Sequence, residues 1–296
     1  MTVPELRIGL PKGRMADGVT RLLATAGIQL KVGRRGYRPW LSLGDTDAKI
    51  LKPQNIIEMV HAGSRHIGFA GADWVEELGY GQDPDLVELL DTGLDPVRVV
   101  VAAPERCIEG GRLRAPPGRS GPLVVATELP RLAQAWLDRN GVQAKVLRTY
   151  GATEVFPPED ADAIVDIAAT GDTLKANSLH IVDEVLFSST RLLGHAGSLE
   201  DPKIKARVDA LVLMLRAALD AETRAMVDLN VASEHRDGVL SLLPALRQPT
   251  ISTLDGGQGF AIRSAVPKKA LAELIPRLRE AGAEDIVVAE PTLLVR

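Results

Sequence analysis

The sequence predicts an α/β protein whose strands and helices alternate along the chain, followed by a smaller ferredoxin-like unit. Three observations lead to this prediction. Short apolar runs alternate with segments of helical periodicity over the first two thirds of the chain. A long helical segment follows near residues 203–222, and the order then changes to strand, helix, strand, strand, helix, strand. The 296 residues suffice for two or three domains, since single cores stop growing near roughly 250 residues.

The body of the protein is predicted from repeated pairs of a strand and a helix. "LRIGL" (residues 6–10) is typical of a strand, and the helix after it places Val19, Leu22, Leu23 and Ala26 on one face before Gly27. Because such pairs recur, we expect largely parallel sheets, with the proline-rich stretch 114–122 lying between strands of one lobe. The other expected elements are a helix over 53–63, strands over 66–71 and 97–104, a strand from 122 that turns at Thr127–Glu128, a helix ending near Gly141, and strands over 144–151 and 162–168.

The C-terminal part has the βαββαβ order of a ferredoxin-like unit. Gly256 and Gly257 supply the backbone freedom for the turn of its central hairpin. By analogy, such an appended unit suggests a ligand-binding regulatory module, and its exposed sheet edges favour an oligomer. The expected strands cover 224–231, 249–255, 259–266 and 285–292, and the expected helices cover 236–246 and 268–282.

Composition excludes several classes of function. Thirty-five basic and 39 acidic residues give a net charge of −4, and aromatic residues make up 3%, so a broad nucleic-acid surface is not expected. The single cysteine excludes a disulfide framework and a cysteine-based metal site. We find no signal peptide and no apolar stretch of the roughly 18 residues that span a bilayer, so we expect a cytoplasmic protein without a membrane partner.

The most informative stretch is "AIVDIAATGDTLKAN" (residues 163–177). It runs from an apolar strand through Asp166 into a loop with Thr170, Gly171 and Thr173, which offer hydroxyl and backbone N–H groups to an anion. The carboxylate of Asp166 could accept hydrogen bonds from vicinal ribose hydroxyls. Alternatively, Thr170 or Asp172 merely caps a helix, and this motif alone does not decide between the two interpretations. If a phosphate binds here, the Asp172 carboxylate should point away from it.

Basic residues form two further clusters. "LPKGRM" sets Lys12, Gly13 and Arg14 directly after the first strand, where open α/β sheets bind ligands. "GRRGYRP" contributes Arg34, Arg35 and Arg38. Taken singly, each cluster is more typical of a solvated turn. The second gains weight only if it faces the same ligand as the first.

Acidic residues follow three of the predicted strands. They are Asp73 in "AGADW", Glu128 in "ATEL" and Glu154 in "YGATEVFPPED", and each could instead sit in the first turn of a helix. Together with the phosphate loop and the cations, these acids suit a phosphorylated sugar bound with a divalent metal. We find no Ser-His-Asp order, activated cysteine or paired carboxylates that would indicate covalent catalysis.

The ordered set of motifs resembles the ATP phosphoribosyltransferase family in its long form. The segments that carry the resemblance are "LPKGR", "YRP", "ILKPQNI", "GFAGADWVEE", "VATELP", "GATEVFP", "DIAATGDTLKANSL" and "LNV…LLPALRQPTIS". The resemblance implies the first step of histidine biosynthesis, which condenses ATP and 5-phosphoribosyl 1-pyrophosphate (PRPP) to N1-(5-phosphoribosyl)-ATP and pyrophosphate. It covers nearly the whole chain and departs from the family at Ala169, usually polar, Ser178, commonly glycine, and His66, usually acidic.

The resemblance also implies an architecture. The catalytic body is expected to have two lobes, as in type 2 periplasmic binding proteins, and the ferredoxin-like unit is expected to bind histidine. Lobe I would comprise residues 1–96 and 188–218, lobe II residues 97–187 with the PRPP loop, and the regulatory domain residues 222–296. Members of this form are hexamers that histidine inhibits, so histidine and further copies of the chain are the implied partners.

Residue roles follow from the same resemblance. The 5-phosphate of PRPP would lie on Ala169–Thr173, with the ribose hydroxyls on Asp166, and Mg²⁺ is the implied cofactor. The nucleotide or pyrophosphate would be bound by Lys12, Gly13, Arg14, Arg38, Asp73, Glu128 and Glu154. Histidine would bind near Asn230, Thr250 and Ser252. Two alternatives remain, namely a phosphoribosyltransferase for another base and a non-catalytic binding or regulatory paralogue.

Overall fold

A computed structural model describes residues 5–33, 36–244 and 248–296. Arg34 and Arg35 of the second basic cluster, and the last part of the helix expected over 236–246, lie outside these ranges. Contacts divide the chain into two compact units. The first holds Met1–Arg21 and Gln29–Val208, and the second holds Leu22–Ile28 and Asp209–Arg296.

One five-stranded sheet of the first unit has the order β4-β1-β5-β14-β6. Strands β1, β4 and β5 are parallel, whereas β14 runs antiparallel to both of its neighbours. Ile8 and Ile67 on the sheet and Ile56 on α2 are fully buried, and each such side chain contributes about 1.5–3 kcal/mol. The elements are β1 (Leu6–Pro11), α1 (Ala16–Thr25), β4 (Thr46–Leu51), α2 (Pro53–His61), β5 (Ile67–Gly71), α3 (Ala72–Glu77), β6 (Leu86–Asp91) and β14 (Thr190–His195).

The other five-stranded sheet of this unit has the order β11-β10-β12-β7-β13. Strands β10, β11 and β12 are parallel, so their carboxyl ends meet at one edge, and β7 and β13 continue the sheet antiparallel. Helix α4 ends at Gly141 in the left-handed conformation, as the sequence predicts. The elements are β7 (Val97–Ala103), β10 (Leu123–Thr127), α4 (Pro130–Asn140), β11 (Ala144–Arg148), β12 (Ala163–Ala168), α5 (Asp172–Ala176) and β13 (His180–Ser188).

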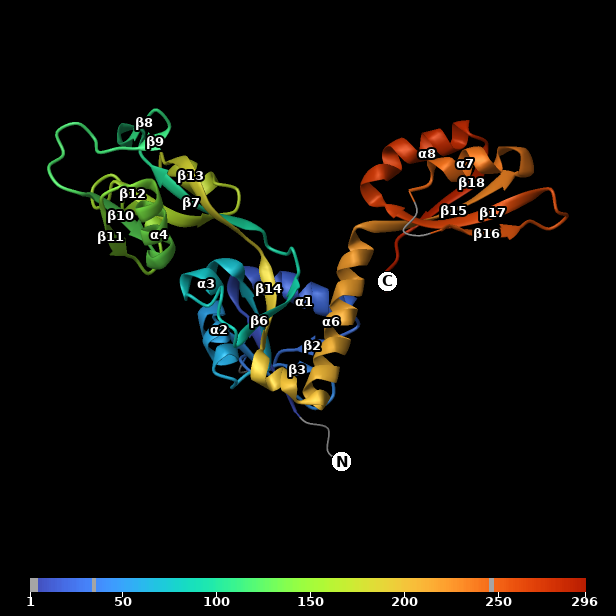
Figure 1. Ribbon diagram of the computed structural model, residues 1–296, viewed down its shortest axis with the longest axis horizontal. Coiled ribbons are helices and arrows are strands. Elements are labelled where there is room, and N and C mark those ends of the chain that lie inside the picture. Colours follow the sequence, from blue (N-terminus) through green and yellow to red (C-terminus); the bar gives the residue numbers. More distant parts are fainter. Residues whose placement is uncertain (1–4, 34–35, 245–247) are drawn as a thin grey trace. The chain divides into compact units, whose positions relative to one another are not determined.

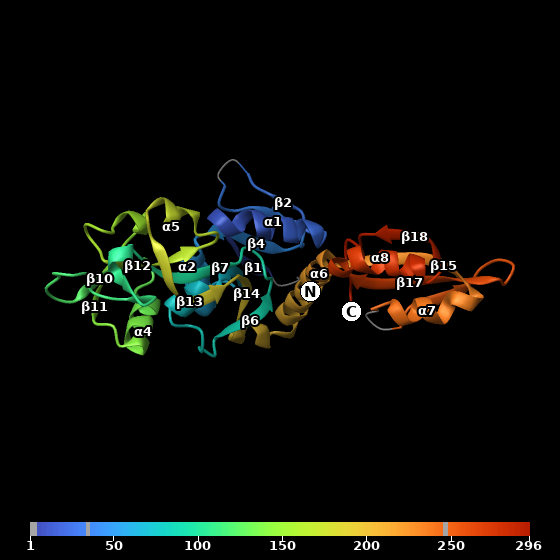
Figure 2. The ribbon, with the colours of Figure 1, turned by 90° about the horizontal axis from the view of Figure 1, so that it is seen from above.

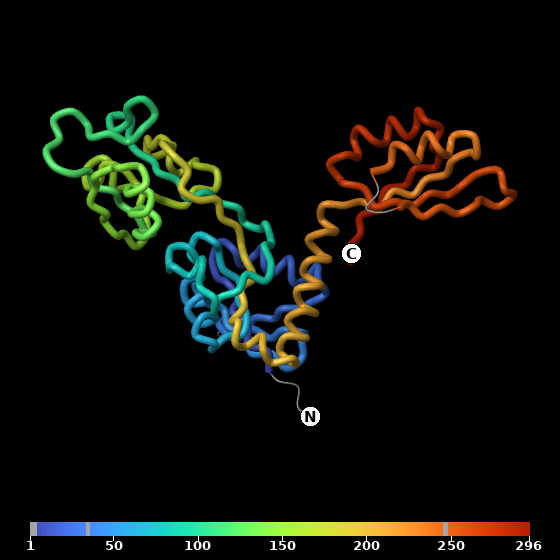
Figure 3. The backbone as a smooth tube through the Cα atoms, in the orientation of Figure 1, coloured from blue at the N-terminus to red at the C-terminus, as the bar shows by residue number. Residues whose placement is uncertain are grey.

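The chain crosses from one sheet to the other twice, between β6 and β7 and again between β13 and β14 (Figures 1 and 3). The two crossings lie side by side. The amide of Thr190 donates to the Leu94 carbonyl at 2.9 Å, and the Thr92 hydroxyl donates to the Thr190 carbonyl at 2.6 Å. Two mixed sheets joined by two neighbouring crossings form the two-lobed architecture of type 2 periplasmic binding proteins, which confirms this part of the predicted fold class. The expectation of largely parallel sheets is wrong, because β14 in one sheet and β7 in the other run antiparallel to both of their neighbours.

The second unit contains the ferredoxin-like sheet, in the order β16-β17-β15-β18 and antiparallel throughout. Helices α7 and α8 pack on one face of this sheet (Figures 1 and 2), where Val227, Leu229 and Ile262 are buried. The βαββαβ prediction is therefore confirmed. The elements are α6 (Pro202–Glu222), whose first residues belong to the first unit, β15 (Arg224–Ala232), α7 (Arg236–Leu242), β16 (Thr250–Thr253), β17 (Gly259–Pro267), α8 (Leu271–Glu280) and β18 (Ala283–Ala289).

Short elements complete the described chain. They are the strands β2 (Leu30–Lys31), β3 (Trp40–Leu41), β8 (Ile108–Glu109) and β9 (Arg112–Leu113), and the 3-10 helices η1 (Gly13–Met15), η2 (Glu105–Cys107), η3 (Thr153–Val155), η4 (Ala196–Glu200), η5 (Ser233–His235) and η6 (Lys268–Ala270). In the part of the chain that the structure describes, no helix is long and apolar enough to cross a membrane.

The structure shows the surroundings of Ser178 and His66, two of the positions at which the sequence departs from the pattern it resembles. Ser178 has a φ of 55°, in the left-handed region that glycine adopts most easily, which explains why glycine is common there. His66 is 7% exposed, and its Nδ1 and Nε2 lie 3.2 and 3.0 Å from the Arg7 backbone amide and the Arg7 side chain, of which a neutral ring accepts a hydrogen bond from one. Burial, together with the charges of Arg7 and Arg65, lowers the pKa of His66 to about 4, so the ring is neutral at pH 7.

Candidate functional site

The strongest candidate site lies at the carboxyl edge of the β10-β11-β12 strands. A cavity of about 320 Å³ opens there, and both Asp166 and Glu154 line it. Because β12 pairs in parallel with β10, the segments that follow these strands emerge at the same edge. The cavity is lined by Glu154, Asp166, Ile167, Ala168, Ala169, Thr170, Gly171, Thr173 and Leu174. The structure thus brings most of the loop residues predicted from the sequence together.

The loop after β12 leaves backbone donors available for an anion. Gly171 has a φ of 82° and precedes the short helix α5, a conformation that other residues adopt only with strain. Within the described chain, we find no backbone acceptor for the amides of Thr170, Gly171 and Thr173. The N-cap residue Gly171 has no side chain to cap α5, but the Thr170 hydroxyl oxygen accepts a long hydrogen bond of 3.4 Å from the Asp172 amide at the start of this helix. Thr170 therefore has a capping contact, and the amides of Thr170, Gly171 and Thr173 are still available to an anion.

Asp172 lies outside this cavity. Its carboxylate accepts a hydrogen bond from the Thr170 hydroxyl at 2.7 Å, and it is not among the lining residues. This placement keeps one negative charge away from the space that a phosphate would occupy. It fits the expectation that Asp172 points away from the anion.

Asp166 is influenced by two other carboxylates at this edge. Burial, together with the negative charges of Glu154 and Glu128, raises the pKa of Asp166 to about 6, although the hydrogen bond from the Ile167 amide acts in the opposite direction. Asp166 is therefore largely ionised at pH 7 and protonated at pH 5. A carboxylate with a perturbed pKa inside a cavity is a recognised mark of a functional site.

Threonines that support these carboxylates were missed as functional positions in the sequence. The Thr127 hydroxyl donates to the Val165 carbonyl at 2.6 Å and accepts from the Leu129 amide at 2.8 Å, which fixes the corner that carries Glu128. The hydroxyls of Thr149 and Thr153 are hydrogen-bonded at 2.8 Å beneath the turn that carries Glu154. The pattern "TYGATE" contains a turn signal, since threonine hydroxyls beside a glycine often stabilise turns through hydrogen bonds, but it does not reveal that Thr149 and Thr153 bond each other.

Lys12, Gly13 and Arg14 lie at the carboxyl end of β1, as the sequence predicts. Lys12 and Gly13 line a cavity of about 200 Å³ whose other walls are mostly apolar. Gly13 has a φ of 78°, so the turn requires glycine here. The guanidinium of Arg14 donates to the Asp95 carbonyl at 2.6 Å. Asp95 belongs to the segment "GLDP", whose glycine and proline are a turn signal in the sequence. That signal could have identified Asp95 as a turn residue beside the site.

The structure does not bring Arg38 into this group. Its guanidinium lies 3.5 Å from Asp47, which is paired in register with Arg7 near the amino end of β1, whereas Lys12 follows the carboxyl end. Asp47 also forms an ion pair with Arg65 at 2.7 Å. The expectation that Arg38 faces the same ligand as Lys12 therefore gains no support from the fold.

Asp73, which was predicted to bind the nucleotide or pyrophosphate, is buried in the structure. It follows β5 at the expected position, but it is 1% exposed, and its Oδ1 accepts a hydrogen bond from the Ser188 hydroxyl at 2.9 Å. Its Oδ2 is buried without a hydrogen-bond partner among the described residues. The structure thus places Asp73 in the first turn of α3, hydrogen-bonded to the last residue of β13.

The predicted effector residues share one face of the ferredoxin-like sheet. In register, Asn230 pairs with Ala261, which pairs on its other side with Ser252, and Thr250 lies two residues before Ser252. This row faces away from the core side, where Leu229 is buried. The Asn230 amide donates to Asp285 at 3.0 Å.

Known proteins resemble this chain over nearly its full length. A family model described as ATP phosphoribosyltransferase matches residues 52–217, and one described as the HisG C-terminal domain matches residues 221–290. An ATP phosphoribosyltransferase of Pelodictyon phaeoclathratiforme is 36% identical over 286 residues, which are 95% of this chain and 94% of the relative. One of Pelotomaculum thermopropionicum is 35% identical over 288 residues, or 96% of each chain.

A solved structure supports the fold. A chain of an ATP phosphoribosyl transferase (HisG:HisZ) complex from Thermotoga maritima matches with a TM-score of 0.60 and 24% identity. The match covers 73% of this chain and 98% of that chain.

Proposed function

The chain belongs to the ATP phosphoribosyltransferase family, and from this premise we propose which of its residues bind the two substrates. It is a pentosyltransferase that condenses ATP and PRPP to N1-(5-phosphoribosyl)-ATP and pyrophosphate, the first step of histidine biosynthesis. The observation that carries the assignment of residues is the cavity lined by Asp166 and the loop after β12.

PRPP is assigned to this cavity. The 5-phosphate accepts hydrogen bonds from the loop Ala169–Thr173, in which the amides of Thr170, Gly171 and Thr173 and the Thr173 hydroxyl are suited to an anion. The ionised carboxylate of Asp166 accepts hydrogen bonds from the ribose hydroxyls, which are strong because the acceptor is charged. PRPP is thereby held at both ends of its ribose ring.

The reaction requires positioning and charge stabilisation. The adenine N1 forms a bond to the anomeric carbon as the bond from that carbon to the pyrophosphate oxygen breaks, and pyrophosphate takes the electron pair. The ribosyl carbon passes through a state with oxocarbenium character, which nearby carboxylates stabilise. Glu154 and Glu128 lie close enough to Asp166 to raise its pKa, so they contribute negative potential where positive charge develops. Holding both substrates in line supplies the remaining acceleration.

Lys12, Gly13 and Arg14 are assigned to the nucleotide or the leaving pyrophosphate. Lys12 and Arg14 supply positive charge, and the apolar walls beside Lys12 suit a purine ring. Arg38 and Asp73 are the less supported members of this set, because Arg38 is paired with Asp47 and Asp73 is buried.

Mg²⁺ is the proposed cofactor. The carboxylate oxygens of Asp166, Glu154 and Glu128 are donors of the hard type that this ion prefers, and Mg²⁺ is usually held by one or two carboxylates together with substrate phosphates. The residues present fit that mode of binding. The ion would neutralise charge on the pyrophosphate.

We expect the activity to depend on the ionisation of Asp166. The value of kcat/KM for PRPP should rise with pH through about 6, because only the deprotonated carboxylate accepts hydrogen bonds from both ribose hydroxyls. Glu154→Gln removes a negative charge that raises this pKa, so the acid limb of the pH profile should move to lower pH. Glu159→Gln, at an exposed position, serves as the control. An acid limb that stays in place in Glu154→Gln would contradict the assignment.

The second unit is proposed to bind histidine and to take part in a homo-oligomer, with a hexamer as the expected state. Asn230, Thr250 and Ser252 offer amide and hydroxyl groups on one open sheet face, which suits the polar groups of an amino acid. We expect histidine to slow product formation by the purified protein, and Asn230→Ala to relieve this inhibition while the uninhibited rate stays unchanged. Activity that is indifferent to histidine would contradict the regulatory proposal and leave the catalytic assignment intact.

The two alternatives are less well supported. A non-catalytic paralogue would not need an ionisable carboxylate and free loop amides in one cavity, yet both are present. A phosphoribosyltransferase for another base would share the PRPP site, so only the identity of the accepted base separates it from the proposed function.

A further inference from the structure

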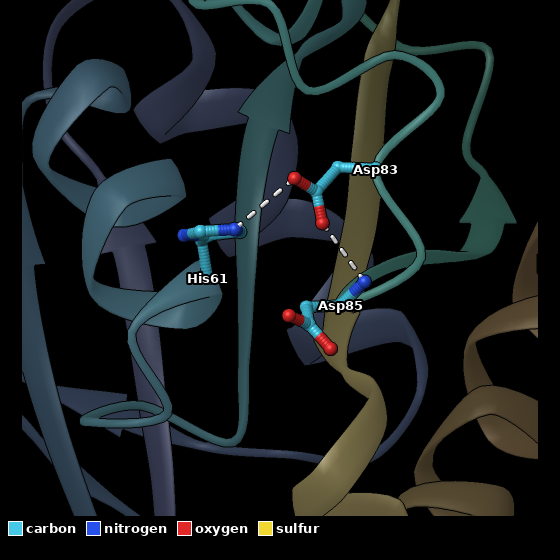
Figure 4. A group of neighbouring side chains, drawn as sticks. All are labelled: His61, Asp83 and Asp85. Carbon is cyan, nitrogen blue, oxygen red and sulfur yellow. Dashed lines mark hydrogen bonds and ion pairs between the residues drawn. The ribbon is translucent and has the colours of Figure 1, made fainter.

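We propose that His61, Asp83 and Asp85 form a binding site for a divalent transition-metal ion of the Zn²⁺ type. The three side chains lie in the first unit, where His61 is the last residue of α2 and the two aspartates precede β6. They play no part in the substrate sites assigned above. Figure 4 shows the imidazole of His61 and the carboxylate of Asp83 pointing toward each other, with Asp85 beside them.

The spacing of the donor atoms suits a metal ion. His61 Nε2 and Asp83 Oδ2 are 3.3 Å apart, and one donor atom from each of the three residues lies within 4.8 Å of the others. Two ligands of a tetrahedral ion with bonds of roughly 2.0–2.1 Å are themselves about 3.3–3.4 Å apart. The His61–Asp83 pair already has this separation, and a rotation of the Asp85 side chain completes the set.

Neighbouring contacts hold the ligands in place. Asp83 Oδ1 accepts a hydrogen bond from the Asp85 amide at 2.9 Å, which leaves Oδ2 directed at His61 (Figure 4). The Asp85 carbonyl accepts from the Ala196 amide at 3.0 Å. The ring of Tyr80 packs against the His61 ring with centroids 4.3 Å apart, and its hydroxyl donates to Glu58 at 3.0 Å. These contacts orient the side chains before a metal arrives.

The local charge favours a cation. Asp83 and Asp85 lie beside the single imidazole, and the Glu58 carboxylate accepts from the hydroxyl of Tyr80, whose ring packs on His61. No ion pair of a lysine or arginine with Asp83 or Asp85 is found within the described chain. The negative end of the α2 dipole adds to this potential, because His61 closes the helix.

The donor set selects the class of metal. Imidazole with carboxylates suits Zn²⁺, Co²⁺ or Ni²⁺, whereas Mg²⁺ prefers oxygen donors and retains several waters. Three protein ligands on a partly exposed surface leave a position for water. Bound metal would join the end of α2 to the segment before β6 and so stabilise the first unit.

The test is a titration of the metal-free full-length protein with Co²⁺ and then Zn²⁺. Excess Mg²⁺ is present so that oxygen-only sites are occupied. We expect one saturable site with the visible absorption bands of Co²⁺ bound to nitrogen and oxygen, displacement by Zn²⁺, and a higher thermal midpoint with metal. Asp85→Asn keeps the His61–Asp83 pair and His61→Gln removes the imidazole. Each should weaken binding at least about tenfold, since even the loss of an outer partner costs roughly 10–100-fold.

His235→Gln is the matched control. His235 lies 3.5 Å from Glu234, an exposed histidine–carboxylate pair that is not part of a three-ligand group in the described chain. This variant should bind Co²⁺ like the original protein. The proposal is overturned if the original protein shows no saturable Co²⁺ binding, if Asp85→Asn binds as tightly as the original, or if His235→Gln loses binding instead. None of these outcomes bears on the phosphoribosyl transfer.

Discussion

Replacing Asp166 with alanine is expected to lower kcat/KM for PRPP by about 10²- to 10⁴-fold, corresponding to the loss of two charge-assisted hydrogen bonds of roughly 1.5–3 kcal/mol each. The carboxylate lines the cavity at the end of β12, and its pKa of about 6 leaves it ionised at pH 7. Since alanine cannot accept hydrogen bonds from the ribose hydroxyls, both binding and orientation of the sugar should suffer. Steady-state kinetics with PRPP as the varied substrate measures the effect.

Two further variants make this result specific. Asp166→Asn keeps the size of the side chain and removes its charge, so it should also be strongly impaired. Asp138→Ala removes an exposed carboxylate on α4, and we expect near-normal activity. If Asp166→Ala and Asp166→Asn both remain folded and turn over at the original rate, the assignment of Asp166 to the ribose is wrong.

Replacing Gly171 with alanine is expected to raise KM for PRPP by about tenfold, because the left-handed conformation costs roughly 1–2 kcal/mol for an L-residue. Gly171 has a φ of 82° within the loop assigned to the 5-phosphate. An added Cβ would lie 3.8 Å from the nearest side-chain atom, on Ile181, so no collision accompanies the strain. The loop therefore either relaxes away from the phosphate or carries the strain, and KM for ATP should change less.

A control with similar strain is available at Gly141. It ends α4 with a φ of 63°, and no atom lies within 4 Å of an added Cβ. Gly141→Ala should lower the thermal midpoint about as much as Gly171→Ala and leave KM for PRPP unchanged. Equal KM values in the two variants would show that the backbone of Gly171 has no special role in binding PRPP.

Much of the fold could be predicted because strong local signals mark its elements. The runs that form β1, β7, β10 and β12 are apolar and bounded by clear turns, and the βαββαβ order of the second unit was confirmed. Strand β13 was not predicted from its own sequence. Most of its residues are exposed, Asp183 and Glu184 interrupt its apolar pattern, and its pairing with β7 shifts register twice. Its place in the sheet depends on contacts across the chain.

The part of the site that could be predicted is the part formed by residues that are adjacent in the sequence. The loop at Thr170–Thr173 forms around a glycine and follows its strand directly, so local sequence determines its shape. Arg38 and Asp73 depend on distant partners, namely Asp47 and Ser188, that no local pattern reveals. His61, Asp83 and Asp85 likewise come together only because α2 ends beside the segment before β6. The bound positions of both substrates remain predictions.

The phosphoribosyl transfer to ATP is tested most directly by identifying the product. Purified protein incubated with Mg²⁺, ATP and PRPP should form N1-(5-phosphoribosyl)-ATP and pyrophosphate in equal amounts, as measured by mass spectrometry and phosphorus NMR. Replacing ATP with other purine or pyrimidine compounds should abolish product. A folded sample that yields no adduct, or one that transfers the phosphoribosyl group to a different base, would contradict the account.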